Sequence, residues 1–206
     1  MTYFLEAAAK YDKKIILLVR PNPLSGNLAM IEGPSLEESV ASFIGRFNIP
    51  IKHQCSLGEL ALYFNTTKHW NAALEVIACT GLKRTDMFSE WNTPWVATSP
   101  AIQNYNACLL YPGLCFFEAT NVSIGRGTTY SFEWFGASWF NMDAIVAVCK
   151  NMFNEDLEME ILSLSFKSEK EWLPGIHCKV KDPENYDAVL NGLLLLKIIK
   201  DLHPNH

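Results

Sequence analysis

The sequence predicts an α/β protein that contains a parallel β-sheet. Two short apolar runs, KKIILLV at 13–19 and LEVIAC at 74–79, have the length and composition of buried strands. Each run follows a segment with helical periodicity, and this alternation of helix and buried strand is typical of a parallel sheet. Each run also ends in a polar loop, RPNPLSG or TGLKR. Ligands of open α/β sheets bind at such carboxyl ends of strands, so we expect a site there.

Two helices of the first half are identified by an apolar face and a start signal. The first is expected over residues 1–12, where one face is made by Phe4, Leu5, Ala8 and Ala9. The second is expected to begin after Ser56, because Ser56 and Glu59 have the spacing of a capping box. The carboxylate of Glu59 is therefore expected to be structural.

The middle of the chain has little periodicity. Residues 85–106 combine prolines with aromatic residues, which predicts a long loop, and loops of this length in compact domains are usually functional or disordered. The aromatic residues argue against disorder. The runs at 106–112 and 114–119 are expected to be strands that break at Pro112 and Gly113.

The last third of the chain alternates between the two kinds of element. Residues 142–153 are expected to be a helix, 157–166 and 175–181 strands, and 184–202 a closing helix. Four tryptophans are either core residues or surfaces on which a sugar ring stacks: Trp91, Trp95, Trp134 and Trp139.

Composition excludes several classes of protein. The 206 residues have 17 basic and 22 acidic side chains, a net charge of -5 and no block of like charges, so a nucleic-acid partner is not expected. Six cysteines occur singly, without the spacing of a zinc site, so we expect free, buried thiols and no metal. The longest aliphatic runs are too short to span a membrane, and no secretion signal is present. As written, the sequence predicts a soluble cytoplasmic protein.

The stretch EATNVSIGRGT at 118–128 gathers polar side chains around two glycines. The glycines allow a tight turn that presents Arg126, whose planar guanidinium suits a carboxylate. The stretch at 118–128 matches neither the glycine pattern of a dinucleotide-binding loop nor that of a P-loop. The alternative is a turn whose arginine pairs with a surface acid. His53 likewise is either a structural hydrogen-bonding residue or part of a site.

Five blocks of the sequence, in order, resemble one family: RPNPLSG, IEGPSLEESVASFIGRFNIPIKH, SLGELA, YPGLCFFEATNVSIGRGTT and FEWFGASWFN. This family comprises the bacterial exo-acting β-N-acetylmuramidases of the NamZ type, also known as DUF1343. The resemblance implies a glycoside hydrolase that removes the terminal non-reducing N-acetylmuramic acid from peptidoglycan fragments, without a cofactor. It also implies part of a Rossmann-like domain at 1–140 and part of a smaller α+β C-terminal lobe at 141–206.

The family pattern also assigns site residues. Glu118 and His53 are expected to be catalytic. The expected substrate-binding residues are Arg20, Asn22, Thr120, Asn121, Ser123, Arg126 and Thr128. An N-acetylmuramic acid ring carries a lactyl carboxylate, an acetamido group and hydroxyls, which call for a guanidinium, carboxamides and an aromatic wall.

Family members carry an EHG segment before the position that corresponds to residue 1 here, and its glutamate is their expected catalytic acid. Any export signal would also lie there. Glycoside hydrolysis usually needs two carboxyl groups, although an acetamido sugar can supply its own nucleophile. We therefore expect little or no hydrolase activity from this chain alone. The alternatives are a non-catalytic muramyl-sugar-binding protein, a half that pairs with a separate N-terminal half or with itself, and a degraded fragment.

Overall fold

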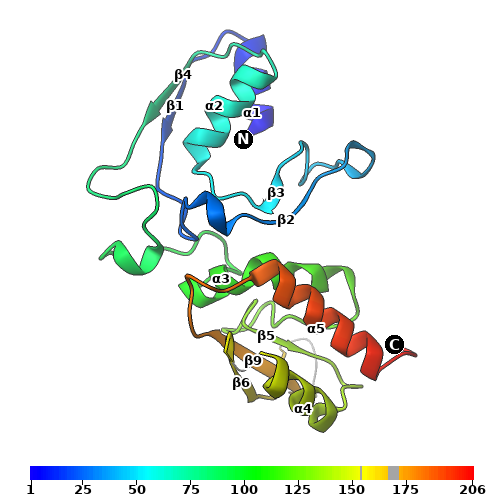
Figure 1. The fold of residues 1–206 in the computed structure, drawn as a ribbon. Coiled ribbons are helices and arrows are strands. Elements are labelled where there is room, and N and C mark those ends of the chain that lie inside the picture. Colours follow the sequence, from blue (N-terminus) through cyan, green and yellow to red (C-terminus); the bar gives the residue numbers. More distant parts are fainter. Residues whose placement is uncertain (154, 167–171) are drawn as a thin grey trace. The chain divides into compact units, whose positions relative to one another are not determined.

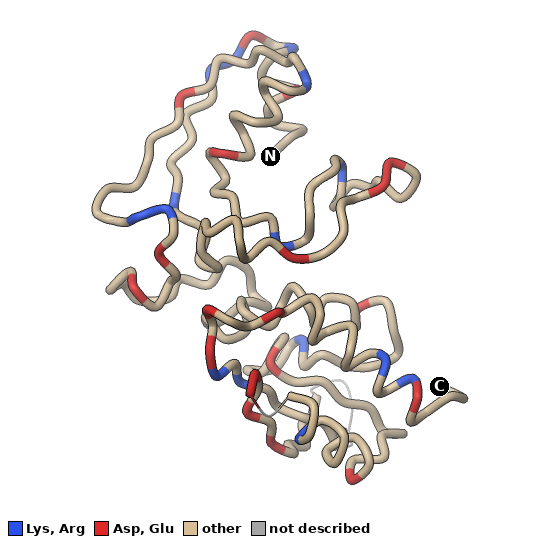
Figure 2. The backbone as a smooth tube through the Cα atoms, viewed as in Figure 1, with Lys and Arg blue, Asp and Glu red and all other residues tan. Residues whose placement is uncertain are grey.

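The computed structural model describes residues 1–153, 155–166 and 172–206 (Figure 1). Two compact units are present. Unit 1 comprises Met1–Ile31 and His53–Thr93, and unit 2 comprises Glu32–Lys52 and Pro94–His206. The division into 1–140 and 141–206 stays a prediction. Acidic and basic residues are dispersed along both units (Figure 2).

Unit 1 contains a two-stranded parallel sheet with two helices. Its elements are α1 (Thr2–Lys10), β1 (Ile15–Leu18), α2 (Leu57–Thr67) and β4 (Leu74–Ile77), with short 3-10 turns at Leu28–Met30 and Phe88–Glu90. β1 pairs in parallel with β4, from Ile15 opposite Leu74 to Leu18 opposite Ile77. The predicted helices, strands and strand direction are confirmed.

The sheet of unit 1 is covered on one side. Figure 1 shows α1 and α2 on the same side of β1 and β4. Burial alternates along both strands, and Ile16, Leu18 and Ile77 are exposed. The prediction of fully buried strands was therefore wrong for one face, because an apolar run predicts burial without showing what covers it.

The capping box at α2 is confirmed. The Ser56 hydroxyl accepts a hydrogen bond from the Glu59 N–H at 3.2 Å, and the Glu59 carboxylate accepts one from the Ser56 N–H at 2.7 Å. Gly58, which lies between Ser56 and Glu59 in the sequence, packs directly on the sheet. A Cβ at Gly58 would lie 2.7 Å from Val19 and 2.8 Å from Val76. The glycine therefore lets the start of α2 approach the ends of both strands.

Unit 2 combines a hairpin, three helices and small antiparallel sheets. Its helices are α3 (Tyr105–Leu114), α4 (Met142–Met152) and α5 (Ala188–Leu202). Its strands are β2 (Glu32–Ser35), β3 (Pro50–Lys52), β5 (Trp134–Gly136), β6 (Leu157–Ile161), β7 (Leu164–Ser165), β8 (Trp172–Leu173) and β9 (Gly175–Val180). Short 3-10 segments occur at Glu38–Val40 and Cys115–Ala119. The main sheet has the order β5-β9-β6, and the hairpin is β2-β3.

The strands predicted at 106–112 and 114–119 are a helix, α3, and a 3-10 turn, η4. The Asn104 carboxamide oxygen caps α3 by accepting a hydrogen bond from the Ala107 N–H at 2.9 Å. Gly113 serves helix packing, because its Cα lies against the backbone of Gly192 in α5. An apolar run of this length fits a buried helix as well as a strand, and Asn104 was the missed start signal.

The strand predicted over 157–166 is divided into β6 and β7. The division falls at Leu162, whose carbonyl accepts a hydrogen bond from the Trp134 indole N–H at 2.7 Å. Trp134 is fully buried and belongs to the core.

All six cysteines are free, but only Cys149 and Cys178 are buried, so the prediction of buried thiols was wrong for the others.

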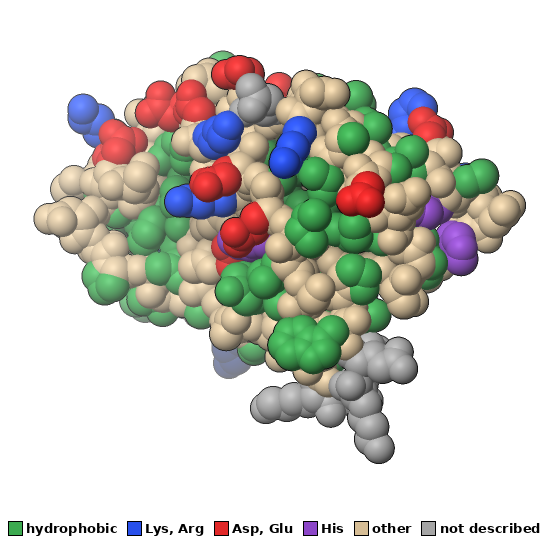
Figure 3. All heavy atoms as spheres, turned by 90° about the horizontal axis from the view of Figure 1, so that it is seen from below, with side chains coloured by type: hydrophobic (Ala, Val, Ile, Leu, Met, Phe, Trp, Pro, Cys, Tyr) green, Lys and Arg blue, Asp and Glu red, His purple; other side chains and the backbone are tan. Residues whose placement is uncertain are grey.

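Within the described part of the chain, none of the helices combines the length and hydropathy needed to span a bilayer. Figure 3 shows one face of the molecule, on which hydrophobic side chains lie between acidic and basic ones.

A buried ion pair anchors the β2-β3 hairpin within unit 2. The Lys52 ammonium pairs with the Glu32 carboxylate, and the two side chains are only 6% and 10% exposed. Glu32 also accepts a hydrogen bond from the Val189 N–H at 2.7 Å, at the start of α5. Each side chain therefore neutralises the charge of the other in a region that is shielded from solvent.

We predict that Lys52→Met lowers the free energy of unfolding by about 3 kcal/mol or more, because Glu32 would remain buried without its cation. Urea denaturation followed by circular dichroism measures this. The matched control is Lys197→Met, which removes an exposed i,i+4 pair with Asp201 and should change stability by less than about 1 kcal/mol. Equal effects of the two substitutions would contradict the argument.

Candidate functional site

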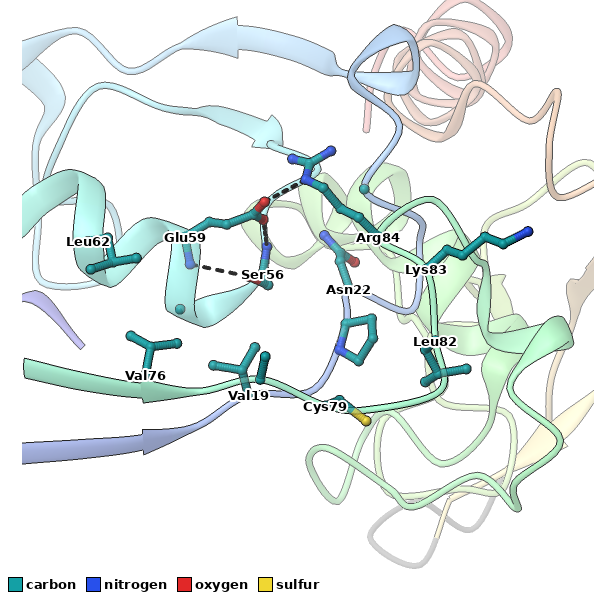
Figure 4. Close-up of a pocket in the computed structure, with 14 residues that line it drawn as sticks. Val19, Asn22, Ser56, Glu59, Leu62, Val76, Cys79, Leu82, Lys83 and Arg84 are labelled. Carbon is teal, nitrogen blue, oxygen red and sulfur yellow. Dashed lines mark hydrogen bonds and ion pairs between the residues drawn. The ribbon is translucent and has the colours of Figure 1, made fainter.

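A crevice of about 270 Å³ lies at the carboxyl ends of β1 and β4 in unit 1 (Figure 4). We call it the strand-end crevice. It is lined by Val19, Pro21, Asn22, Gly26, Ser56, Gly58, Glu59, Leu62, Val76, Ala78, Cys79, Leu82, Lys83 and Arg84. One wall is apolar, and the polar groups come from the start of α2 and from the two strand-end loops.

The loops after β1 and β4 are tied together by hydrogen bonds. The Ser25 hydroxyl donates to the Thr85 carbonyl at 2.7 Å, and the Gly26 N–H donates to the Arg84 carbonyl at 2.9 Å. A Cβ at Gly26 would lie 2.5 Å from that carbonyl oxygen, so the close approach requires glycine. The SG pair of RPNPLSG therefore fixes the rim of the crevice.

Two charged groups of the rim, Arg84 and Glu59, are paired with each other. Arg84 Nε lies 2.5 Å from Glu59 Oε1, and Arg84 also donates to the Gln54 carbonyl at 3.1 Å. Burial disfavours ionisation of Glu59, but hydrogen bonds from Arg84 and Ser56 outweigh it and hold its pKa below the ordinary value. Figure 4 shows the Lys83 amine pointing away from the other lining side chains.

Three of the predicted site residues belong to unit 1. Asn22 lines the crevice and donates to the Cys55 carbonyl at 3.3 Å, whereas Arg20 is exposed. His53 is half-buried, and its Nδ1 accepts a hydrogen bond from the Cys55 N–H at 3.1 Å. Burial lowers the pKa of His53, with a smaller opposing effect from Glu59. Neutral His53 therefore carries its proton on Nε2, where it can donate.

Unit 2 has a second cavity, of about 330 Å³, that we call the Arg126 pocket. It is lined by Thr98, Ser99, Ala101, Ile102, Cys108, Tyr111, Arg126 and Phe132. The residues come from the long loop before α3, from α3 itself and from the turn at 125–132. The loop predicted over 85–106 thus contributes four of the lining residues.

The turn at 125–127 has the predicted conformation. Gly125 and Gly127 have φ angles of 69° and 83°, which an L side chain rarely adopts. The Arg126 guanidinium forms an ion pair with the Glu118 carboxylate and lies 5.5 Å from the centre of the Phe132 ring. Arg126 therefore does pair with a surface acid, as one hypothesis expected, and this acid is the predicted catalytic residue Glu118.

The other predicted residues of this region have local roles in the structure. The Thr120 hydroxyl donates to the Phe117 carbonyl at 2.8 Å, and the Thr128 hydroxyl donates to the Gly125 carbonyl at 2.7 Å. Ser123 forms a backbone bridge to Gly136 at 2.9 Å. These contacts brace the loop. Asn121 is exposed on it. A substrate-binding role for these side chains stays a prediction.

A buried carboxylate that the sequence did not reveal lies at the start of α3. Glu133 accepts hydrogen bonds from the carboxamides of Asn104 at 2.5 Å and Asn106 at 2.7 Å, and its Oε2 lies 3.9 Å from His177 Nε2. His177 Nδ1 contacts Glu160 at 2.9 Å. The partners are distant in sequence, so no local spacing could have identified the cluster.

Glu133 and His177 each shift the pKa of the other. Burial raises the pKa of Glu133, but the nearby His177 imidazole and hydrogen bonds from Asn106 and Asn104 outweigh it, and the pKa lies below its ordinary 4.5. The nearby Glu133 carboxylate raises the pKa of His177 above 6.5, against the effect of burial. The lowered carboxyl pKa stabilises the fold above pH 4.5, and the raised imidazole pKa stabilises it below pH 6.5.

We therefore expect the contribution of this pair to stability to be greatest between pH 4.5 and 6.5. It should decrease as the pH falls through the folded-state pKa of Glu133 or rises through that of His177. Thermal unfolding of wild type and His177→Gln from pH 4 to 9 measures this difference. A difference in melting temperature that does not vary with pH would show that His177 acts by packing alone.

Thiol reactivity tests whether the strand-end crevice is accessible. Cys79 is the one exposed cysteine, whereas burial raises the pKa of Cys55 and of the four remaining thiols. An aromatic disulfide reagent at pH 8 should thus label Cys79 first, as located by peptide mass spectrometry. Cys79→Ser should remove the fast phase, and a fast phase that survives this substitution would contradict the assignment.

Within the described ranges, no cluster of three or more His, Cys, Asp or Glu side chains could bind a metal ion.

Comparison with protein families gives two adjoining matches. Residues 1–106 match the N-terminal domain of exo-beta-N-acetylmuramidase NamZ, and residues 109–206 match its C-terminal domain. The peptidoglycan beta-N-acetylmuramidase NamZ of Bacillus subtilis (strain 168) is 34% identical over 207 residues, which cover 99% of this chain and 50% of that protein. The resemblance seen in the five sequence blocks is confirmed.

Two crystal structures of DUF1343 family proteins from Bacteroides fragilis NCTC 9343 are similar to this chain. One has a TM-score of 0.87 at 26% identity, over 98% of this chain and 53% of that protein. The other has a TM-score of 0.60 at 29% identity, over 97% and 51%. The α/β fold class is confirmed, and the chain spans about half the length of these relatives.

Proposed function

Because this chain belongs to the NamZ family of exo-β-N-acetylmuramidases, we propose that it takes part in removing terminal non-reducing N-acetylmuramic acid from peptidoglycan fragments. The observation that carries the proposal is the Glu118–Arg126 ion pair, whose guanidinium lines a cavity large enough for a sugar ring. An acid and a carboxylate-binding cation thus lie together on one loop.

The two charged groups match the chemistry of the substrate. The Arg126 guanidinium, which contacts Glu118 through one nitrogen, has a planar set of donors that can bind the lactyl carboxylate in exchange for Glu118. The carboxamide of Asn121, in the same unit as Arg126, can bind the acetamido group and the ring hydroxyls.

Glu118 is the proposed general acid. Its protonated carboxyl would transfer a proton to the glycosidic oxygen as the bond from that oxygen to C1 breaks. The acetamido carbonyl oxygen of the same sugar would form the new bond to C1. Water would then open this ring, add its oxygen to C1 and return a proton to the Glu118 carboxylate. This mechanism requires only one carboxyl group from the chain, so release that depends on Glu118 would overturn the expectation from the sequence that the chain alone has little or no hydrolase activity.

We predict that Glu118→Gln lowers release of N-acetylmuramic acid from a chromogenic muramoside by about 100-fold or more, because an amide cannot supply the proton. The assay uses the purified 206-residue chain. Glu184→Gln, which changes an exposed carboxylate that lines neither cavity, is the matched control and should leave release unchanged. Release that is measurable but insensitive to Glu118→Gln would exclude Glu118 as the acid.

A second candidate function is a non-catalytic or complementing muramyl-sugar-binding half. The bare face of the β1-β4 sheet favours it, because Ile16 is 60% exposed and Leu18 is 76% exposed. Parallel sheets are usually covered on both faces, and exposed apolar faces mark association sites. The covering polypeptide would be a separate N-terminal half or a second copy of the chain.

Size-exclusion chromatography combined with light scattering distinguishes a monomer from an oligomer and from a complex with an N-terminal half. If the face mediates association, the chain elutes as an oligomer or as a complex with a co-expressed N-terminal half, and Leu18→Lys returns it to a monomer. Leu193→Lys, at an exposed leucine of α5, is the matched control and should not change the mass. A cooperative, soluble wild-type monomer that forms no complex would rule out this candidate.

A further inference from the structure

We propose that Tyr111 is a specificity-determining residue that contacts substrate, because its ring forms the wall of the Arg126 pocket on which a carboxylate-bearing pyranose stacks. This inference rests on the proposed function and extends it to a residue outside the expected site. Tyr111 lines the pocket from α3, and 42% of its surface is exposed. An exposed aromatic wall next to a cation suits a sugar that carries a carboxylate.

The ring of Tyr111 is held in a fixed orientation. It meets Phe132 edge to face, with the ring centres 4.8 Å apart and the planes at 80°. Phe132 is buried, and the Arg126 guanidinium also lies near its ring, 5.5 Å from the ring centre. Phe132 therefore positions both the aromatic wall and the cation, so the two groups can contact a single ligand together.

The phenol of Tyr111 adds a hydrogen-bond donor to this wall. Burial raises the pKa of Tyr111, and the Cys115 and Glu118 side chains act in the same direction, against Arg126. The phenol therefore keeps its proton at neutral pH. Its O–H can donate to a carboxylate or to a ring oxygen, while the face of the ring contacts the apolar C–H groups of the sugar.

The loop before α3 supplies a further polar group to the pocket. The Ser99 hydroxyl oxygen accepts hydrogen bonds from the Ala101 and Ile102 N–H groups, each at 3.2 Å. Its own proton stays available for donation. Ile102 is buried and provides an apolar contact. One cation, two hydroxyl donors and an aromatic wall favour an anionic sugar over a neutral one, since only the anion engages the guanidinium.

The test compares the binding of N-acetylmuramic acid and N-acetylglucosamine to the 206-residue chain. The two sugars differ by the lactyl ether, and titration calorimetry with two-dimensional NMR reports the affinity and the residues that respond. The variants are Tyr111→Ala, which removes the ring, and Tyr111→Phe, which removes only the hydroxyl. Tyr63→Ala is the matched control, because Tyr63 is exposed on α2 and lines neither cavity.

We expect wild type to prefer N-acetylmuramic acid, and Tyr111→Ala to weaken its binding roughly 5- to 10-fold, as for loss of one aromatic contact. Tyr111→Phe should weaken it less than Tyr111→Ala, and Tyr63→Ala should leave it unchanged. NMR shifts should centre on residues 98–102, 111 and 126. Folding of each variant is checked in the same spectra, and Tyr111→Leu, which keeps bulk without a π face, replaces Tyr111→Ala if the latter unfolds.

The outcomes separate this inference from the function on which it rests. Binding of N-acetylmuramic acid that is unaffected by Tyr111→Ala and Tyr111→Leu would overturn the role of Tyr111 and leave the proposed function standing. Binding of neither sugar by wild type at millimolar concentration would overturn both. Equal affinity for the two sugars would overturn the carboxylate specificity of the pocket.

Discussion

The arrangement of unit 2 depends on the buried carboxylate of Glu133. It accepts hydrogen bonds from Asn104 and Asn106 at the start of α3, and it lies beside His177 of β9. A buried charge is tolerated only when such partners compensate its lost hydration. Because Glu133 follows Phe132 directly, this constraint also fixes the pocket wall. The helix that carries Tyr111 and the strand that follows Arg126 are thus held by one carboxylate.

Glu59, which lines the strand-end crevice, and Glu118, which pairs with Arg126 of the other cavity, differ in the other interactions that they make. Glu59 caps α2 and pairs with Arg84, so releasing it would also disrupt the start of a helix. Glu118 pairs with Arg126 and caps nothing, since the 3-10 segment around it has no side-chain cap. A general acid gives up and regains a proton, so its carboxyl group must not be needed to cap a helix. This difference favours Glu118 over Glu59 as the reactive acid.

The sequence predicted the elements whose signals are local. The capping box at Ser56, the glycine turn around Arg126 and the parallel strands all depend on residues close in sequence, and the structure confirms them. The errors had two sources. The local start signal of α3, Asn104, was missed. The packing of α5 on α3 and the burial of Glu133 depend on partners that are distant in sequence. The resemblance to a family pointed to the 118–128 loop, but only the structure joined it to Tyr111.

The exposure of the Glu118–Arg126 pair has an energetic consequence. Its side chains are 37% and 57% exposed, and ion pairs at such surfaces contribute at most about 1 kcal/mol to stability. Rearranging the pair therefore costs the fold little. A ligand carboxylate that enters the Arg126 pocket competes with Glu118 for one guanidinium, and salt screens both interactions similarly. Under the proposed function, the substrate carboxylate would replace Glu118 on Arg126, and Glu118 would then lie beside the sugar without its cation.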